Sequence, residues 1–153
     1  MQAIDGQTHA SAKELAEELL TLWHHLMRGS SQELYALLTQ LDLSMAHIKT
    51  LHALADAEGE LSVKEAGELL GLSLPGASRV VETLLRRGFL TRREDPRDRR
   101  VKRVRITSEG LDVVRRIDGA RLVGLEAYTS GLTQPQRDAL AAALRDLPHR
   151  SAT

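Results

Sequence analysis

The stretch that decides the fold is Ser73–Thr107, SLPGASRVVETLLRRGFLTRREDPRDRRVKRVRIT. Its first residue is a serine that can cap a helix, and a proline falls in the first helical turn, where its missing N–H costs little. Gly88 is suited to end this helix. Phe89–Arg93 and Arg100–Thr107 then have the character of strands, and the turn-rich segment between them predicts a hairpin tip. The stretch therefore predicts a helix followed by a β-hairpin.

Basic residues are concentrated in the same stretch. It holds eleven basic and four acidic residues, a net charge of +7, whereas the rest of the chain holds ten basic and seventeen acidic residues, a net charge of −7. Ten of the eleven are arginines, whose planar fork matches phosphate and guanine. A basic segment in an otherwise acidic chain indicates contact with a polyanion. A solvated charged surface is the alternative.

The composition sets limits on the class of protein. The chain has 153 residues, 42% of them hydrophobic and 27% charged, which fits one domain or one core with dimerising extensions. No apolar run approaches the ~20 residues of a membrane span, and Met1–Ala12 lacks the features of a signal peptide. Without cysteine there are no disulfides and no thiolate metal site. We therefore expect a cytoplasmic protein.

Two helices are expected in the N-terminal part of the chain. Ala12–Arg28 is expected to be the first, and its apolar residues recur at helical spacing: Leu15, Leu19, Leu22, Trp23 and Leu26. So many apolar positions predict burial on two sides, as in a dimer. Gly29–Ser31 is expected to break this helix, and Gln32–Gln40 to form a second, shorter one.

A helix-turn-helix unit is expected next. Ser44 can cap a helix whose apolar residues are Ile48, Leu51 and Leu54. Ser62 and Glu65 have capping-box spacing at the start of a short helix, whose apolar face is Ala66, Leu69 and Leu70. Gly71 then gives a tight turn into the helix that Ser73 caps.

Two further helices are expected after the hairpin. A long one begins near Thr107 and runs to about Ser130, with Leu111, Val114, Ile117, Leu122 and Leu125 apolar. Gly131 interrupts, Thr133 caps the last helix and Pro148 closes it, with Leu140, Leu144 and Leu147 apolar. The predicted fold class is mainly α with a small β-hairpin (α+β).

The helix that starts at Ser73 has two distinct faces. With ~3.6 residues per turn, Ala77, Val81, Leu84 and Leu85 fall on one half. Gly76, Arg79, Thr83 and Arg86 lie within about 60° of one direction on the other half. A helix that is smooth at its N-terminal end and carries arginine further along suits the ~12 Å major groove. A surface helix with a few exposed arginines is the alternative.

The hairpin tip is the sharper signal. It holds Arg97, Arg99 and Arg100, with Asp95 just before them and Asp98 among them. An arginine at a protruding tip suits a narrow minor groove, and a neighbouring aspartate can orient the guanidinium. The strand cations Lys102, Arg103 and Arg105 are better placed for the flanking phosphates, which fix register but carry no sequence information.

The run from about Leu43 to Gly110 resembles the MarR family of winged helix-turn-helix transcriptional regulators. The match rests on Ser73–Leu84, on Arg87–Leu90 and on Asp95–Thr107, with Ile106–Gly110 as the exit from the hairpin, or wing. The resemblance implies a winged helix-turn-helix DNA-binding domain over residues 43–110. It implies dimerising helices over residues 1–42 and 111–153, and an obligate homodimer that binds a palindromic duplex.

The resemblance also implies roles for particular residues. Asp98 and Arg100 match the family's wing Asp-x-Arg, whose arginine enters the minor groove. The expected DNA-binding residues are Ser73, Pro75, Gly76, Ser78, Arg79, Thr83, Arg86, Arg97, Asp98, Arg99, Arg100 and Lys102. The expected dimer core includes Leu15, Leu19, Leu22, Leu26, Leu140, Leu144 and Leu147.

Many members of the family respond to small phenolic or anionic ligands. The corresponding residues here would be Trp23, His24, Arg28, Met45 and His47, although an aromatic and a methionine on helices are more often core. The thiol-sensing branch is excluded because the chain has no cysteine. No cofactor or metal is expected, since the histidines at positions 24, 25, 47 and 52 do not form a recognisable ligand set.

Three classes of function compete. The first is a dimeric, sequence-specific regulator of transcription, most often a repressor relieved by a ligand. The second is a nucleoid-type winged helix that binds nucleic acid without base selection. The third, an enzyme, is disfavoured because the sequence has no P-loop, dinucleotide glycine motif, paired catalytic carboxylates or nucleophile signature.

Overall fold

The computed structural model describes residues 10–57 and 59–147, with the side chains of all of these except 29–33. The elements follow in the order α1 (Ala12–Leu41), α2 (Met45–Asp56), β1 (Leu61–Ser62), α3 (Val63–Leu70), α4 (Leu74–Arg86), β2 (Leu90–Glu94), β3 (Lys102–Ile106), α5 (Ser108–Ser130) and α6 (Gln134–Asp146). The predicted fold class, mainly helical with a small hairpin, is confirmed.

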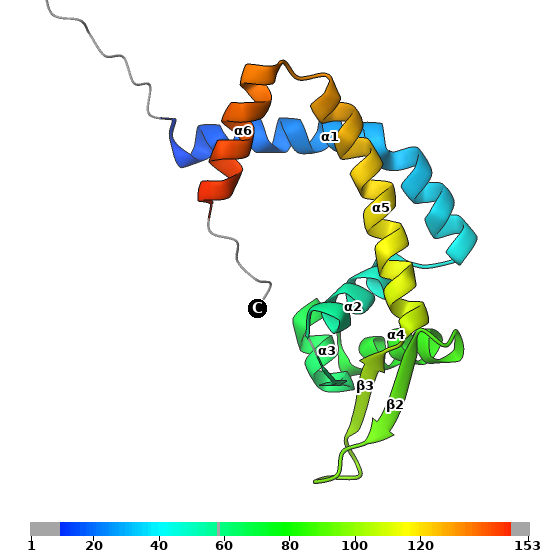
Figure 1. The fold of residues 1–153 in the computed structure, drawn as a ribbon. Coiled ribbons are helices and arrows are strands. Elements are labelled where there is room, and N and C mark those ends of the chain that lie inside the picture. Colours follow the sequence, from blue (N-terminus) through cyan, green and yellow to red (C-terminus); the bar gives the residue numbers. More distant parts are fainter. Residues whose placement is uncertain (1–9, 58, 148–153) are drawn as a thin grey trace, which may run out of the picture.

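The elements form a lobe and an arm (Figure 1). The lobe consists of α2, α3, α4, the three strands and the first turns of α5. The arm consists of α1, the rest of α5 and α6. Four predicted N-caps are confirmed, each with the side-chain oxygen accepting a backbone N–H of the first turn: Ser44, Ser62, Ser73 and Thr133. Thr107, near which a helix was expected to begin, caps α5 in the same way. These caps satisfy donors that a helix start leaves open.

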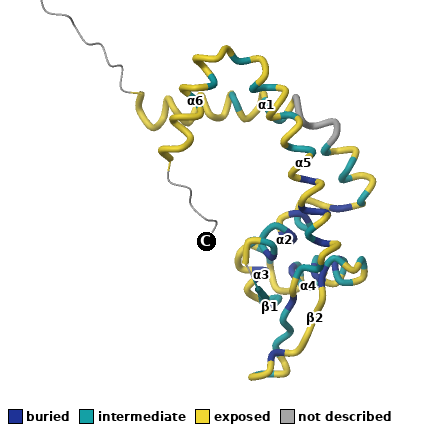
Figure 2. Tube along the Cα trace, viewed as in Figure 1, coloured by how far each residue is buried: buried dark blue, intermediate teal, exposed yellow. Residues whose placement is uncertain are grey.

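The buried core lies in the lobe. Its members come from α2, α4, the sheet, the first turns of α5 and the residue before Ser44: Leu43, Ile48, Leu51, Leu54, Val81, Leu84, Leu90, Val104, Val113, Val114 and Ile117. Figure 2 shows the buried segments gathered in the lobe and at its junction with α5, while most of the arm is exposed. The lobe therefore carries the contacts that one chain can make alone.

The sheet has three antiparallel strands in the order β1-β3-β2. The hairpin of β2 and β3 was predicted from the sequence, whereas β1 was not. Leu61 pairs with Val104, which places the start of α3 directly beside the middle strand. A two-residue strand has no periodicity to detect. Its pairing is what joins the helix-turn-helix to the wing.

The predicted break at Gly29–Ser31 is wrong, because α1 is one helix from Ala12 to Leu41. Its N-terminal part and its last turns run in different directions (Figure 1). A glycine costs a helix about 1 kcal/mol relative to alanine. Packing of the last turns offsets this, since Leu34, Leu37, Leu38 and Leu41 lie against the lobe core.

Other apolar residues predicted to face inward are exposed in the single chain. Leu69 on α3 is 52% exposed, as is Leu122 on α5. Helix α6 has no buried residue, and the proline predicted to close it, Pro148, lies outside the described residues. Across residues 10–57 and 59–147, no helix has the length and apolar character to cross a membrane.

Candidate nucleic-acid interface

The N-terminal end of helix α4 is exposed to solvent. Ser73 caps it, with the Ser73 Oγ accepting the Gly76 N–H at 3.3 Å. Pro75 lies in the first turn and is exposed. The predicted two faces are confirmed, because Ala77, Val81 and Leu84 are buried while Arg79 is exposed.

The turn before α4 brings two helices close together. Gly71 has a φ of 64°, in the left-handed region that favours glycine. A Cβ on Gly67 would lie 3.0 Å from the Ala77 Cβ, so α3 and α4 cross almost in backbone contact. This packing fixes the direction in which α4 projects from the lobe.

The tip of the wing is closed by two aspartates. The Asp95 Oδ1 accepts the Arg97 N–H at 2.8 Å, and the Asp98 Oδ1 accepts the Arg100 N–H at 3.0 Å. These short-range bonds are the Asx turns that the tip composition predicts. The Arg97 N–H, more than any other group, holds the pKa of the Asp95 carboxyl below its usual range, with Arg103 adding to it.

The aspartate that was expected to orient a tip arginine does so. The Arg100 Nε donates to the Asp98 Oδ1 at 3.1 Å and the Nη2 to the Oδ2 at 3.4 Å. The Arg100 side chain is 92% exposed. The guanidinium is thus held in a fork while remaining open to a ligand.

Carboxylates neutralise much of the basic stretch. Five of its cations form ion pairs with acids outside the tip or at its edge: Arg87 with Asp42, Arg92 with Glu82, Arg93 with Glu60, Lys102 with Glu94, and Arg103 with Asp95 and Glu65. Within the described ranges, the cations of the stretch without an ion pair are Arg79, Arg86, Arg97, Arg99 and Arg105. Positive charge is therefore available on α4, at the tip and at one position of β3.

The structure brings part of α4 and part of the wing together. A shallow pocket of about 380 Å³ is lined by Ser78 of α4 and by Arg100 and Lys102 of the wing, three of the predicted residues. The sequence analysis did not predict the other lining residues, among them Lys64 on α3 and Leu74, which is 56% exposed. Lys64 lies near the wing because β1, which ends two residues before it, pairs with β3. The sequence analysis did not predict this pairing.

The remaining predicted residues lie at the N-terminal end of α4, further along this helix and at the wing tip. Thr83 donates its hydroxyl to the Arg79 carbonyl at 3.1 Å and accepts from the Arg86 Nη2 at 3.3 Å. Arg97 lines a separate pocket of about 600 Å³ together with Arg93, Arg103 and Arg105. Arg99 lies at the tip and is exposed.

The five residues predicted to bind a small ligand are divided between two helices. Trp23, His24 and Arg28 lie on α1, while Met45 and His47 lie on α2. The His47 Nδ1 accepts the Ser44 N–H at 3.0 Å, so this ring is part of a helix cap. Burial, more than the nearby Arg87, lowers the pKa of His47.

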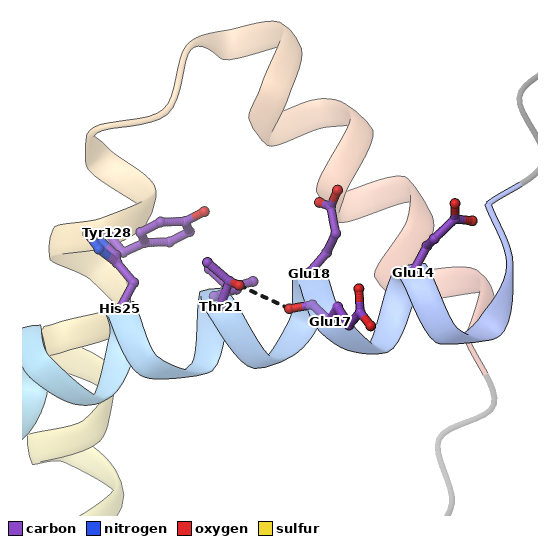
Figure 3. A pocket seen from close by; sticks show the side chains of 7 residues that line it. Glu14, Glu17, Glu18, Thr21, His25 and Tyr128 are labelled. Carbon is purple, nitrogen blue, oxygen red and sulfur yellow. Dashed lines mark hydrogen bonds between the residues drawn. The ribbon is translucent and has the colours of Figure 1, made fainter.

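A pocket of about 740 Å³ does lie on α1, and a different set of residues lines it: Glu14, Glu17, Glu18, Thr21, Leu22, His25 and Tyr128. Figure 3 shows the Tyr128 side chain of α5 beside His25 of α1. The two rings pack edge to face, with their centroids 5.6 Å apart. Throughout the described part of the chain, no group of three or more histidines and carboxylates could hold a metal ion.

A sequence model of the MarR family matches residues 41–101, from the end of α1 to the wing. This part of the chain is therefore similar to the MarR family. The resemblance drawn from the sequence is thereby confirmed over residues 43–101, which build α2, β1, α3, α4 and β2.

Solved structures share the fold of the MarR winged helix and its arm. The transcriptional regulator Tm0710 from Thermotoga maritima is 24% identical, with 88% of this chain and 91% of that chain covered at a TM-score of 0.74. A mutant of S. aureus MepR, bound to an oligodeoxyribonucleotide, is 21% identical over 86% and 93%, at 0.65. The regulator PcaV from Streptomyces coelicolor, in complex with its natural ligand, is 28% identical over 95% of each chain, at 0.51.

Proposed function

We propose that the chain is a homodimeric, sequence-specific DNA-binding regulator of transcription, a repressor relieved by a small-molecule ligand. The observation that carries the proposal is the pocket that α4 and the wing share, which is lined by Ser78 of α4 and by Arg100 and Lys102 of the wing. A helix and an arginine-tipped hairpin in this arrangement suit one major groove and the adjacent minor groove.

The proposed contacts divide into two kinds. On α4 the exposed N-terminal end and the unpaired Arg79 face base edges, where arginine binds guanine. On the wing the oriented Arg100 enters the minor groove, and the other cations contact phosphate. The full proposed set is Ser73, Pro75, Gly76, Ser78, Arg79, Thr83, Arg86, Arg97, Asp98, Arg99, Arg100 and Lys102.

Dimerisation is supported by the exposure of the arm. Leucines at helical spacing on α1 and α6 are half-exposed in the single chain, among them Leu15, Leu19 and Leu144. A contiguous apolar surface of this kind marks an interaction site. We propose that residues 1–42 and 111–153 pair with a second copy, which would place two winged helices on a palindromic duplex with half-sites about 10 bp apart.

Two related proteins support the DNA and ligand parts of the proposal. MepR was solved bound to an oligodeoxyribonucleotide, and PcaV with its natural ligand. For this chain we propose a phenolic or anionic ligand between arm and lobe, near Trp23, His24, Arg28, Met45 and His47. Release of DNA would follow if the ligand changes the spacing of the two α4 helices.

Footprinting on the promoter beside the chain's own gene tests the function, followed by competition with unrelated duplexes. A specific regulator protects a discrete palindrome and prefers it by ~10³-fold or more. Protection without boundaries, with unrelated DNA competing equally, would instead favour the nucleoid-type alternative. An Arg100→Ala variant is expected to lose affinity while remaining dimeric, which gel filtration checks.

A further inference from the structure

Arg103 on β3 was expected to contact phosphates, but in the structure its guanidinium is paired with two carboxylates. Its Nε donates to the Asp95 Oδ2 at 2.7 Å, and its Nη1 to the Glu65 Oε2 at 3.0 Å. The Arg103 side chain is 30% exposed and that of Asp95 only 12%. A guanidinium held on two sides by carboxylates has few donors left for a phosphate.

The two carboxylates are themselves fixed to backbone. Asp95 accepts the Arg97 N–H at the base of the wing tip, at 2.8 Å. Glu65 accepts the Ser62 N–H at 2.6 Å and so completes the cap of α3. Because hydrogen bonds favour the ionised forms, the pKa values of both carboxyls lie below their usual range. Arg103 therefore joins the wing tip to the first turn of the helix-turn-helix.

The strand pairing explains why acids are needed at this point. Arg93 and Arg103 lie directly opposite each other on β2 and β3, and like charges in that relation are destabilising. Glu60 compensates Arg93, with its Oε2 at 2.6 Å from the Arg93 Nη2. Asp95 and Glu65 compensate Arg103. The cluster thus combines two arginines with three carboxylates drawn from the lobe and the tip.

We propose that Arg103 is a positioning residue that acts through Asp95 and Glu65, an inference that rests on the proposed DNA-binding function. It fixes the wing relative to α3 and α4, so that Arg100 reaches the minor groove when α4 occupies the major groove. Arg103 itself does not touch DNA. Holding the tip in its bound direction lowers the ordering cost of binding.

The decisive variant is Asp95→Asn, because its two possible effects have opposite signs. The variant removes a negative charge beside DNA, which would strengthen binding by electrostatics alone. If Asp95 serves Arg103, binding weakens instead, by roughly tenfold for a charge-assisted bond. Glu94→Gln is the matched control: it removes the same charge one residue away and frees Lys102, so its affinity is expected to stay or rise.

The probes are two 30-bp duplexes, one rich in A-tracts and one all G·C. Arginine favours the narrow minor groove of A-tracts, so the ratio of the two affinities measures how well the wing is placed. Asp95→Asn and Arg103→Lys are expected to lower this ratio, with the slope of log affinity against log salt unchanged. Arg103→Lys keeps its charge, so a phosphate contact would survive it.

A double-variant cycle tests whether the effect passes through the tip. If Asp95 acts by placing Arg100, Asp95→Asn adds little to the loss that Arg100→Ala already causes. Glu65→Gln covers the case in which Asp95→Asn fails to fold, because glutamine can still complete the capping box but removes the negative charge that forms the ion pair with Arg103. It too is expected to lower the ratio.

Several results would overturn the assignment. Asp95→Asn binding as tightly as the unmodified protein would do so, and so would Arg103→Lys with an unchanged ratio. Arg103→Gln removes the charge, and a salt slope shallower by about one in that variant would make Arg103 a phosphate contact. If the unmodified protein binds neither duplex at low salt, the proposed function itself fails.

Discussion

Leu51 and Leu19 have similar places in the sequence pattern and opposite environments in the structure. Each is one of several leucines on the apolar stripe of a helix, yet Leu51 in the lobe is 0% exposed and Leu19 in the arm is 56% exposed. The same contrast runs through α5. Val113 and Ile117 near the lobe are buried, whereas Leu122 and Leu125 further out are exposed.

The contrast teaches that helical periodicity identifies an apolar face but not what covers it. In the lobe the covering residues come from the same chain. In the arm, exposed apolar residues lie on α1, on α5 and at the C-terminal end of α6: Leu15, Leu19, Leu20, Trp23, Leu122, Val123, Leu125, Leu144 and, directly after α6, Leu147. Such an apolar surface on a single chain is the basis for proposing a second copy as its cover.

The largest expected effect is on stability, and it is tested by comparing alanine variants at two glycines of α5. A Cβ on Gly110, at the lobe end of α5, would lie 2.3 Å from the Phe89 carbonyl oxygen, which as backbone cannot move aside easily. We expect Gly110→Ala to lower the free energy of unfolding by about 3 kcal/mol, measured by urea denaturation. Gly119→Ala is the control in the arm, where a Cβ meets nothing within 4 Å.

Gly119→Ala should leave stability unchanged or raise it by up to ~1 kcal/mol, since alanine favours a helix. Equal losses in the two variants would mean that the second copy packs tightly on the arm at Gly119. The contrast between lobe and arm would then be smaller than the single chain suggests.

The next effect concerns association. Leu19→Lys places an ammonium on the apolar face of α1, and burying it against a second copy is costly. We expect the dissociation constant of the dimer to rise by about a hundredfold, or ~2.7 kcal/mol, in sedimentation equilibrium. Leu69→Lys is matched to it, because Leu69 is 52% exposed on α3 of the lobe. If both variants weaken the dimer equally, the interface is not confined to the arm.

The sequence predicted the lobe well, because its signals are local. Capping residues, the positive φ of Gly71 and the alternation of faces on α4 depend on neighbours within one or two turns. The predicted break in α1 was wrong for the opposite reason. The packing of Leu37 and Leu38 on the lobe core outweighs the local preference of Gly29–Ser31.

Charge was the least predictable property of the candidate site. The sequence locates the arginines, and Asp98 beside Arg100 was expected to orient it. The partners of Arg103 lie 8 and 38 residues away, and the β1 pairing brings one of them near. A count of charges along the chain therefore overstates the cations that are free to bind.

A smaller effect is expected at Arg79, one of the two α4 cations for which the described residues provide no ion pair. Arg79→Ala should weaken binding to the footprinted site by ~1–3 kcal/mol and leave the dimer intact. Titration with the site and with unrelated duplex separates the two kinds of contact. A loss confined to the site makes Arg79 a base contact, and an equal loss on both, with a shallower salt slope, makes it a phosphate contact.

The smallest expected effect is the pH dependence of stability in the lobe. Hydrogen bonding, from the Arg97 N–H first and Arg103 second, lowers the pKa of Asp95 in the folded state. The folded state then binds fewer protons than the unfolded one, so the contribution of Asp95 is present above its ordinary pKa of about 4 and is lost as the pH falls through the lower, folded value. The Tm difference between the unmodified protein and Asp95→Asn should therefore be largest near pH 6 and should shrink below about pH 4. A Tm difference that stays constant between pH 6 and pH 3 would mean that Asp95 stabilises the wing by its shape alone and that its charge, and with it the tie to Arg103, contributes nothing.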